Sequence, residues 1–293
     1  MKVIVTGSKG QLGSQIIEVL TKGSSELGVI DKEYKSAQII GIDVDELDIT
    51  NLAEVKKFIK HEKPHIVINP AAYTNVDGCE SNEDLAFKVN SLGARNIAIG
   101  CEEAGAKMVH ISTDYVFEGN GIKPYKEYDK TNPVSVYGKT KLAGENFVRD
   151  FCTSYFIVRT SWLYGYNGKN FVKTILKAAK EKGYLEVVND QRGNPTNAED
   201  LVYHLLKLML TEEYGIYHCT GEGECTWYDF AKAIVELANI SCEVIPITSD
   251  KISRPAKRPS YSSLDNMMLR CTVGNEMRSW REALKVFIQN ENI

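Results

Sequence analysis

Features that would mark several other classes of protein are scarce or missing in this sequence of 293 residues. Its first residues, MKVIVTGSKG, hold only a short apolar run, whereas a secretory signal needs about 7–15 apolar residues. No stretch approaches the roughly 20 apolar residues that cross a membrane. We therefore expect a cytoplasmic protein that has no membrane partner.

The sequence also lacks an excess of basic charge and any grouping of cysteines. Its 35 Lys and Arg residues against 39 Asp and Glu residues give a net charge of −4, so we expect no nucleic-acid partner. The 7 cysteines are odd in number and scattered, with no C-x-x-C pair. This pattern is typical of reduced, buried thiols rather than of disulfides or a metal centre. We therefore expect no bound metal.

What the sequence does contain is a regular alternation of short apolar runs and helical periods. The expected strands are 2–6, 37–43, 65–69, 106–113 and 155–161, and the expected helices are 11–22, 51–62, 82–105, 135–151 and 170–183. The strand runs are continuously apolar, which is typical of strands buried on both faces of a parallel sheet. The sequence thus predicts an α/β fold with a doubly wound, Rossmann-like parallel sheet.

This rhythm loosens after about residue 165. Further strands are expected at 184–190 and 215–221, further helices at 198–213 and 226–240, and a proline-containing loop at 253–266. We predict a dinucleotide-binding domain over 1–165 and a smaller carboxyl-terminal, substrate-binding lobe over 166–293. Some of the later elements are expected to rejoin the first domain.

A glycine-rich loop, TGSKGQLGSQ, joins the first expected strand to the first expected helix. Its glycines are Gly7, Gly10 and Gly13, a G-x-x-G-x-x-G spacing. Glycines in this place let the chain turn sharply, let the backbone approach a pyrophosphate and let the helix pack on the strand. The loop therefore predicts a bound dinucleotide.

A carboxylate after the second strand should then bind the adenine ribose. Asp31 lies nearer the usual distance from the glycine loop, but Asp43 ends the better strand. We favour Asp43 and interpret 24–37 as an insertion. Asp43 favours NADH, whereas Lys9 in the glycine loop could pair with the 2′-phosphate of NADPH, so the sequence leaves both cofactors open.

The stretch SVYGKTKLAGE places Tyr137 and Lys141 four residues apart on one face of an expected helix. We expect the ammonium group to lower the pKa of the phenol, which would make Tyr137 an acid or base usable near neutral pH. The preceding strand ends in HISTDYVF. Thr113 and Asp114 should therefore lie at the carboxyl edge of the sheet, where ligands bind.

Taken together, these residues resemble those of the extended short-chain dehydrogenase/reductases, and more closely those of the dTDP-4-dehydrorhamnose reductases. The matching motifs are TGSKGQLG, INPAAYTNVDGCE, ISTDYVFEG, VYGKTKLAGE, RTSWLYG, NFVKT, DQRGNPT, TWYDFA and RPAKRPSYSSL. They cover nearly the whole chain. The resemblance implies reduction of dTDP-4-dehydro-L-rhamnose at C4 by NADPH or NADH, in cell-surface polysaccharide biosynthesis.

The same resemblance implies roles for individual residues. Tyr137 would donate a proton to the C4 oxygen, Lys141 would tune Tyr137 and bind the nicotinamide ribose, and Thr113 would hydrogen-bond the substrate. The implied cofactor-binding residues are Gly7, Gly10, Gln11, Leu12, Gly13, Asp43, Asp48, Ile49, Ala71, Ala72, Tyr73, Tyr137 and Lys141. Tyr73 departs from the histidine common in the family, which puts that contact in doubt.

For the dTDP-sugar, the resemblance implies a further set of contacts. The implied substrate-binding residues are Thr113, Asp114, Trp162, Asn170, Arg192, Arg254 and Arg258. Arginine suits a diphosphate because its guanidinium group binds phosphate in a bidentate manner. Some family members form dimers bridged by magnesium through glutamates. Gln15 stands at one such position, which again argues against a metal and leaves a monomer or a homodimer open.

Two other classes of function remain open at this point. A related branch of the superfamily is a non-catalytic, cofactor-binding regulatory subunit, but the presence of Thr113, Tyr137 and Lys141 favours an enzyme. A nucleotide-sugar epimerase or dehydratase is the other alternative. Dehydration is disfavoured because no glutamate follows Asp114 directly.

Overall fold

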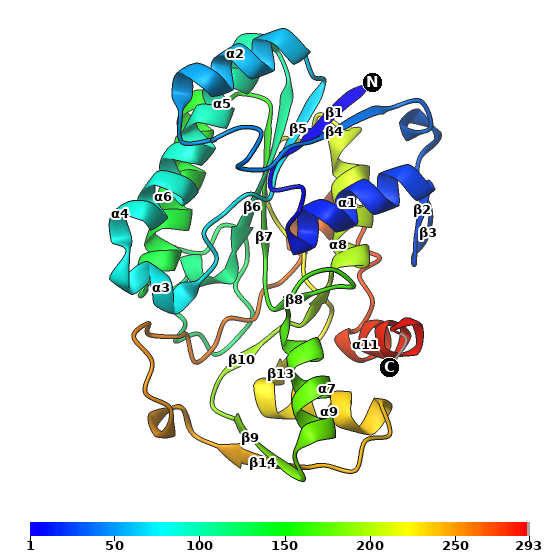
Figure 1. Cartoon of the computed structure of the whole chain (residues 1–293). Helices are drawn as coiled ribbons and strands as arrows, with labels where there is room; N and C mark the ends of the chain where they lie inside the picture. Colours follow the sequence, from blue (N-terminus) through cyan, green and yellow to red (C-terminus); the bar gives the residue numbers. More distant parts are fainter. Residues whose placement is uncertain (292–293) are drawn as a thin grey trace.

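The upper lobe of the computed structural model, which describes residues 1–291, contains a six-stranded parallel sheet (Figure 1). Its order is β12 (Gly215–His218), β7 (Tyr155–Thr160), β6 (Lys107–Thr113), β5 (Ile66–Asn69), β1 (Lys2–Val5) and β4 (Gln38–Gly41). The chain leaves β1 for β4 on one side and then crosses to β5 on the other. This reversal confirms the predicted Rossmann-like fold and creates a crevice beyond the carboxyl ends of β1 and β5.

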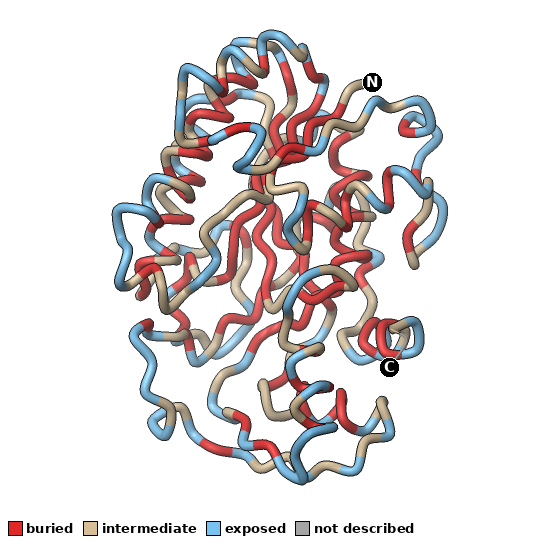
Figure 2. The backbone as a smooth tube through the Cα atoms, in the orientation of Figure 1, coloured by how far each residue is buried: buried red, intermediate tan, exposed pale blue. Residues whose placement is uncertain are grey.

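Helices cover both faces of this sheet (Figure 1). One face carries α2 (Leu52–Glu62), α5 (Ala94–Ala104) and α6 (Val136–Phe151), and the other carries α1 (Gln11–Lys22) and α8 (Ala198–Met209). Each face has its own apolar core, and Figure 2 shows the inner strands β1, β5, β6 and β7 as almost continuously buried, whereas the edge strand β4 is not. Burial on both faces explains why the strand sequences are apolar without alternation.

The helix expected over 82–105 is not a regular α-helix along its whole length. It consists of α4 (Glu83–Phe87), a π-helical turn η2 (Lys88–Gly93) and α5, and a short helix α3 (Val76–Ser81) precedes it. The π-turn packs closely on α6, where a Cβ atom at Gly144 would lie 2.4 Å from the carbonyl oxygen of Asn90. Glycine at that position is what allows the two helices to approach.

The segment interpreted as an insertion forms a small structure of its own. A two-residue hairpin, β2 (Ser24–Ser25) with β3 (Gly28–Val29), is followed by a 3₁₀ turn, η1 (Lys32–Tyr34). Tyr34 is buried and donates a hydrogen bond to the carbonyl oxygen of Leu206 on α8 (2.7 Å), which fastens the segment to the upper lobe.

The lower lobe is built from three helices and a second parallel strand pair. Helices α7 (Phe171–Glu181), α9 (Trp227–Leu237) and α11 (Trp280–Asn290) pack with β9 (Tyr184–Val188) and β14 (Glu243–Ile247) around a separate core. The remaining short elements are η3 (Asp114–Val116), β8 (Leu163–Tyr164), β10 (Arg192–Gly193), β11 (Thr196–Asn197), β13 (Cys225–Thr226), η4 (Ser249–Lys251) and α10 (Met267–Cys271). Although β12 and α8 follow residue 166, they lie in the upper lobe (Figure 1).

Cysteine burial departs in part from the expectation. All the cysteines are free, and five of them are buried, but Cys242 is half-buried and Cys271 is exposed. The expectation of burial was therefore wrong for these two, which lie near the surface of the carboxyl-terminal third. Within residues 1–291, no helix is both long enough and apolar enough to cross a membrane.

Candidate active site

The glycine loop forms a backbone cradle between β1 and α1. Gly7 has a φ of +54°, and the amide of Gly10 donates to its carbonyl oxygen (3.0 Å). A Cβ atom at Gly13 would lie only 2.1 Å from the same carbonyl oxygen, so a side chain there cannot be accommodated. The loop thus brings bare backbone and the amino terminus of α1 to the crevice, an arrangement that suits a phosphate group.

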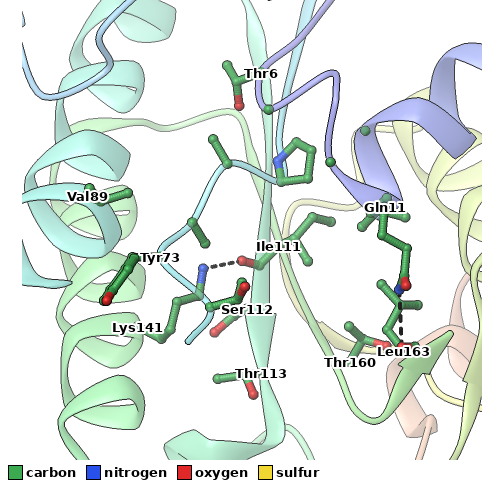
Figure 3. Close-up of a pocket in the computed structure, with 18 of the residues that line it drawn as sticks. Thr6, Gln11, Tyr73, Val89, Ile111, Ser112, Thr113, Lys141, Thr160 and Leu163 are labelled. Atoms are coloured by element: carbon green, nitrogen blue, oxygen red, sulfur yellow. Dashed lines mark hydrogen bonds between the residues drawn. The ribbon is translucent and has the colours of Figure 1, made fainter. Parts of the chain in front are cut away.

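A cavity of about 890 Å³ runs along this edge of the sheet. The expected cofactor-binding residues all line it, from Gly7 through Tyr73 to Lys141, together with Thr113, Asp114 and Trp162. Figure 3 shows that Tyr73 and Lys141 approach the cavity from one side of β6 and Gln11 from the other. The cavity also has lining residues that the sequence did not single out, among them Lys169, an exposed cation, and Trp227.

Unpaired buried polar atoms support the fit of a dinucleotide to this cavity. Gln11 donates through its amide to the carbonyl oxygen of Leu163 (3.1 Å; Figure 3), but its Oε1 has no partner. Thr160 Oγ1 and Asp114 Oδ2 are likewise buried without a partner, and all three residues line the cavity. Buried polar atoms of this kind require hydrogen-bond partners, which a polar ligand would supply.

Asp43, and not Asp31, lines the cavity. The carboxylate of Asp43 accepts hydrogen bonds from the amides of Lys9 (3.0 Å) and Val44 (2.8 Å). Asp31 instead caps η1 by accepting from the amide of Glu33 (2.9 Å). Asp31 therefore has a local structural role.

Tyr137 and Lys141 lie on the face of α6 that meets β6. Burial raises the pKa of Tyr137, and the Thr113 hydroxyl opposes this shift only partly. Lys141 donates instead to the carbonyl oxygen of Ile111 (2.6 Å; Figure 3), and burial lowers its own pKa to about 8 against the opposing charge of Glu145. The expectation that Lys141 lowers the pKa of Tyr137 was therefore wrong, because desolvation dominates.

Asp114 is buried beside these groups. Its Oδ1 accepts a hydrogen bond from the Thr113 hydroxyl (2.9 Å), and burial raises its pKa to about 6. Tyr115, the next residue, packs edge-on against Tyr137 with 5.6 Å between ring centroids. The Asp114 carboxylate and the Tyr137 phenol thus lie beside the hydroxyl of Thr113, in a cleft that also contains Tyr115 and Lys141.

A second cavity of about 700 Å³ lies in the lower lobe and shares Tyr115 and Trp227 with the first. Arg254 and Arg258 line it, and both face Asp77, with Arg258 making two hydrogen bonds to it (3.1 and 3.2 Å) and Arg254 an ion pair at 3.6 Å. The structure thus brings these two arginines together at the end of the cleft opposite the glycine loop.

Two of the expected substrate-binding residues line neither cavity. Arg192 forms an exposed ion pair with Glu224 (3.3 Å), and Asn170 caps α7 by accepting from the amide of Lys173 (3.0 Å). The neighbouring Gln191 lines the second cavity instead.

Gln15, the residue that departs from the magnesium pattern, donates its amide to buried Glu199 (2.6 Å). Among residues 1–291, no group of three or more His, Cys, Asp or Glu side chains is arranged to hold a metal ion.

Comparison with known proteins identifies the family. A family model described as the RmlD substrate binding domain matches residues 1–293. The chain belongs to the RmlD family. The spore coat polysaccharide biosynthesis protein SpsK of Bacillus subtilis is 38% identical to it over 291 residues, with 99% of this chain and 98% of that protein covered.

Two solved structures extend this finding to the fold. A dTDP-4-dehydrorhamnose reductase from Clostridium acetobutylicum is 47% identical, with a TM-score of 0.93 and 99% of both chains covered. A dTDP-4-dehydrorhamnose reductase from Bacillus anthracis, solved in complex with NADP, is 43% identical, with a TM-score of 0.92 and 98% of both chains covered. Membership of the RmlD family confirms the resemblance that the motifs indicated, over the full length of the chain.

Proposed function

We propose that this RmlD-family chain reduces dTDP-4-dehydro-L-rhamnose at C4 to dTDP-L-rhamnose, with NADH or NADPH as the reductant. The observation that carries the proposal is the meeting of Thr113, Tyr137 and Lys141 in one cleft. This cleft runs from a glycine cradle at one end to Arg254 and Arg258 at the other. A dinucleotide suits the cradle, and the diphosphate of a nucleotide-sugar suits the arginines.

When bound, the cofactor supplies the hydride. The chain must then deliver a proton to the carbonyl oxygen, and Tyr137 is suited to this task. Because burial raises the pKa of Tyr137, the phenol remains protonated at neutral pH. An alkoxide is a stronger base than a phenolate, so the phenol gives up its proton only as negative charge develops on the oxygen. We expect the Thr113 hydroxyl to orient that oxygen.

Lys141 contributes charge rather than a proton. With a pKa of about 8, its buried ammonium group is still charged at neutral pH. Its hydrogen bond to Ile111 fixes the group beside β6, on the wall of the cofactor cavity. There we expect it to stabilise negative charge that develops nearby and to bind a ribose hydroxyl of the cofactor.

The second cavity would hold the dTDP moiety. Arg254 and Arg258 currently share the single carboxylate of Asp77, so a diphosphate, with more charge and more acceptor oxygens, would compete for them. Tyr115 and Trp227 line both cavities and therefore mark the passage where the sugar would join the diphosphate. Trp162, which stacks on Trp227, would then contact the sugar ring.

The experiment that tests this function is oxidation of NADH and NADPH by the chain with dTDP-4-dehydro-L-rhamnose as substrate. One cofactor consumed for each dTDP-L-rhamnose formed, as resolved by NMR, supports a reductase. Turnover without net oxidation would support an epimerase, and tight cofactor binding without turnover would support a regulatory subunit. If another 4-keto-6-deoxy sugar, tested in parallel, is reduced faster, the proposed type of reaction stands and the proposed substrate is wrong.

A further inference from the structure

Behind the catalytic cleft, α6 presents a third polar residue to β6. Tyr137, Lys141 and Glu145 are four residues apart and therefore share one face of the helix. Lys141 donates to the carbonyl oxygen of Ile111, and the hydroxyl of the next residue, Ser112, donates to Glu145 Oε1 (2.5 Å). Two successive residues of one strand thus engage two successive turns of the helix.

Glu145 is fastened on its other side to β7. Arg159 binds its two carboxylate oxygens in a bidentate manner, from Nε (2.9 Å) and Nη2 (2.7 Å). Arg159 in turn lies over the ring of Phe117, 5.1 Å from the centroid, and approaches His218 Nε2 (3.4 Å). All of these side chains are buried, so one carboxylate connects α6 to two strands of the sheet.

Holding a helix on a sheet with a buried ion pair has a large cost in desolvation free energy. The free energy lost when Glu145 and Arg159 leave water offsets much of the free energy gained from their attraction. Apolar residues of similar size often stabilise a fold equally well. What the pair does provide is geometric precision, because bidentate hydrogen bonds accept only a narrow range of positions. The pair lies one helical turn beyond Lys141, so its precise geometry also fixes the position of Lys141 in the cleft.

We propose that Glu145 is a positioning residue: held by Ser112 and Arg159, it sets the register of α6 against β6 and keeps the charged Lys141 in place at the cofactor cavity. The expected effect on kcat rests on the proposed function, whereas the expected effect on the NADH dissociation constant does not. Glu145 lies outside the residues that line the cavity, so its action passes through Lys141.

The charges around Lys141 make this proposal measurable. The titratable groups that surround it are Tyr137 and Glu145 on α6, His110 on β6, Asp114 on η3 and Arg159 on β7. Of these, Glu145 is the one whose charge opposes the lowering of the Lys141 pKa by burial. Without it, Lys141 loses its proton at a lower pH.

The test compares Glu145→Gln, Ser112→Ala and Ser112→Thr with the native chain from pH 6 to 9. Asp200→Asn is the matched control, because it removes the charge of another buried carboxylate that pairs with an arginine, the half-buried Arg278, on the far side of the sheet. For each variant we would measure the pH dependence of kcat, the pH dependence of the NADH dissociation constant from tryptophan fluorescence, and the unfolding temperature.

We expect Glu145→Gln to lower kcat about 10-fold. It should also shift the alkaline limb of both pH profiles to lower pH by roughly 0.5 pH unit or more. Ser112→Ala, which leaves the ion pair intact and so keeps the fold, should lower kcat several-fold, and Ser112→Thr should restore it. The control Asp200→Asn should lower the unfolding temperature and leave the pH profiles of the native chain unchanged.

Profiles of Glu145→Gln that coincide with those of the native chain would overturn the proposal, as would a Ser112→Ala variant indistinguishable from the native chain in both readouts. If Glu145→Gln does not fold, Ser112→Ala and its threonine rescue decide the matter. If the native chain reduces no sugar, the proposed function fails by itself, and the pH dependence of NADH binding still tests Glu145.

Discussion

The rings of Trp162 and Trp227 stack face to face, with 3.5 Å between their centroids and 7° between their planes. Trp162 holds this position with a φ of +47°, and its ring fills the space that a Cβ atom at Gly193 would need. The stack joins the residue that precedes β8 to the first residue of α9 in the lower lobe. Trp162 lines the first cavity and Trp227 lines both, near the expected sugar site.

Replacing the outer member of this stack should weaken sugar binding. We expect Trp227→Leu to raise KM for the dTDP-sugar about 10-fold, because an aromatic contact contributes roughly 0.5–1.5 kcal/mol beyond its burial. The dissociation constant of the cofactor should change little. Steady-state kinetics with NADH titration measures both quantities.

Trp280→Leu is the matched control for that variant. Trp280 packs on Phe230 in the same lobe but lines neither of the two cavities, so its loss should reduce stability without raising KM. Equal effects of Trp227→Leu and Trp280→Leu on KM would contradict a direct role for the stack.

The glycine cradle makes a sharp prediction about cofactor binding. Gly13→Ala would place a methyl group 2.1 Å from the carbonyl oxygen of Gly7, so the loop must move and lose its phosphate-binding shape. We expect NADH affinity to fall by about 10²-fold or more. Gly183→Ala, at a site with no atom within 4 Å of the new methyl group, should leave affinity unchanged in the same titration.

The buried carboxyl group of Asp114 should lower the stability of the fold at neutral pH. Burial raises its pKa from 3.8 to about 6, so the folded chain binds more protons than the unfolded chain between these values, and stability falls as pH rises through that window. The ionised group therefore destabilises the fold at neutral pH by about 2–3 kcal/mol.

Asp114→Asn removes this titration and should also impair sugar reduction. The unfolding temperature of the variant minus that of the native chain should be largest above pH 7. This difference should decrease as the pH is lowered towards 5. Thermal unfolding at several pH values measures the difference. A difference that does not vary with pH would rule out the buried charge as its cause.

Charges beside Asp43, at the expected adenine-ribose end of the cavity, predict a preference for NADH. Lys9 is occupied by ion pairs with Asp45 (3.0 Å) and Glu46 (3.2 Å), next to the carboxylate of Asp43, so a 2′-phosphate meets negative charge there. The double substitution Asp45→Asn with Glu46→Gln should free Lys9 and tighten NADPH binding about 10-fold, with a smaller effect on NADH. Asp31→Asn, away from the cavity, is the control, and titration calorimetry gives each dissociation constant.

Much of the fold was predictable because the strands are buried on both faces and the helices have one apolar face. The helices at α1, α2 and α6 begin and end within a residue of their expected bounds. The π-turn at η2 was not predictable, because it depends on the close approach of Asn90 to Gly144, a contact between distant segments. The two-residue strands β8 and β10 are likewise too short to leave a periodic signal.

The candidate site was predictable where a local motif determines it, as at the glycine loop and at Tyr137 with Lys141. Trp227 lies within the motif TWYDFA, which carried part of the resemblance, but nothing in its spacing indicates that it stacks on Trp162. The pKa of Tyr137 could not be inferred from its neighbour in sequence. It depends on how far several packed elements exclude water, and this burial outweighs a charge four residues away.

The most direct test of the account is the rate of NADH or NADPH oxidation with dTDP-4-dehydro-L-rhamnose, measured for the native chain beside Tyr137→Phe. We predict stoichiometric turnover by the native chain and a loss of about 10²-fold or more in the variant, with cofactor affinity retained, because only the proton donor is removed. Turnover by Tyr137→Phe at the native rate, or none by a native chain that binds cofactor tightly, would contradict the account.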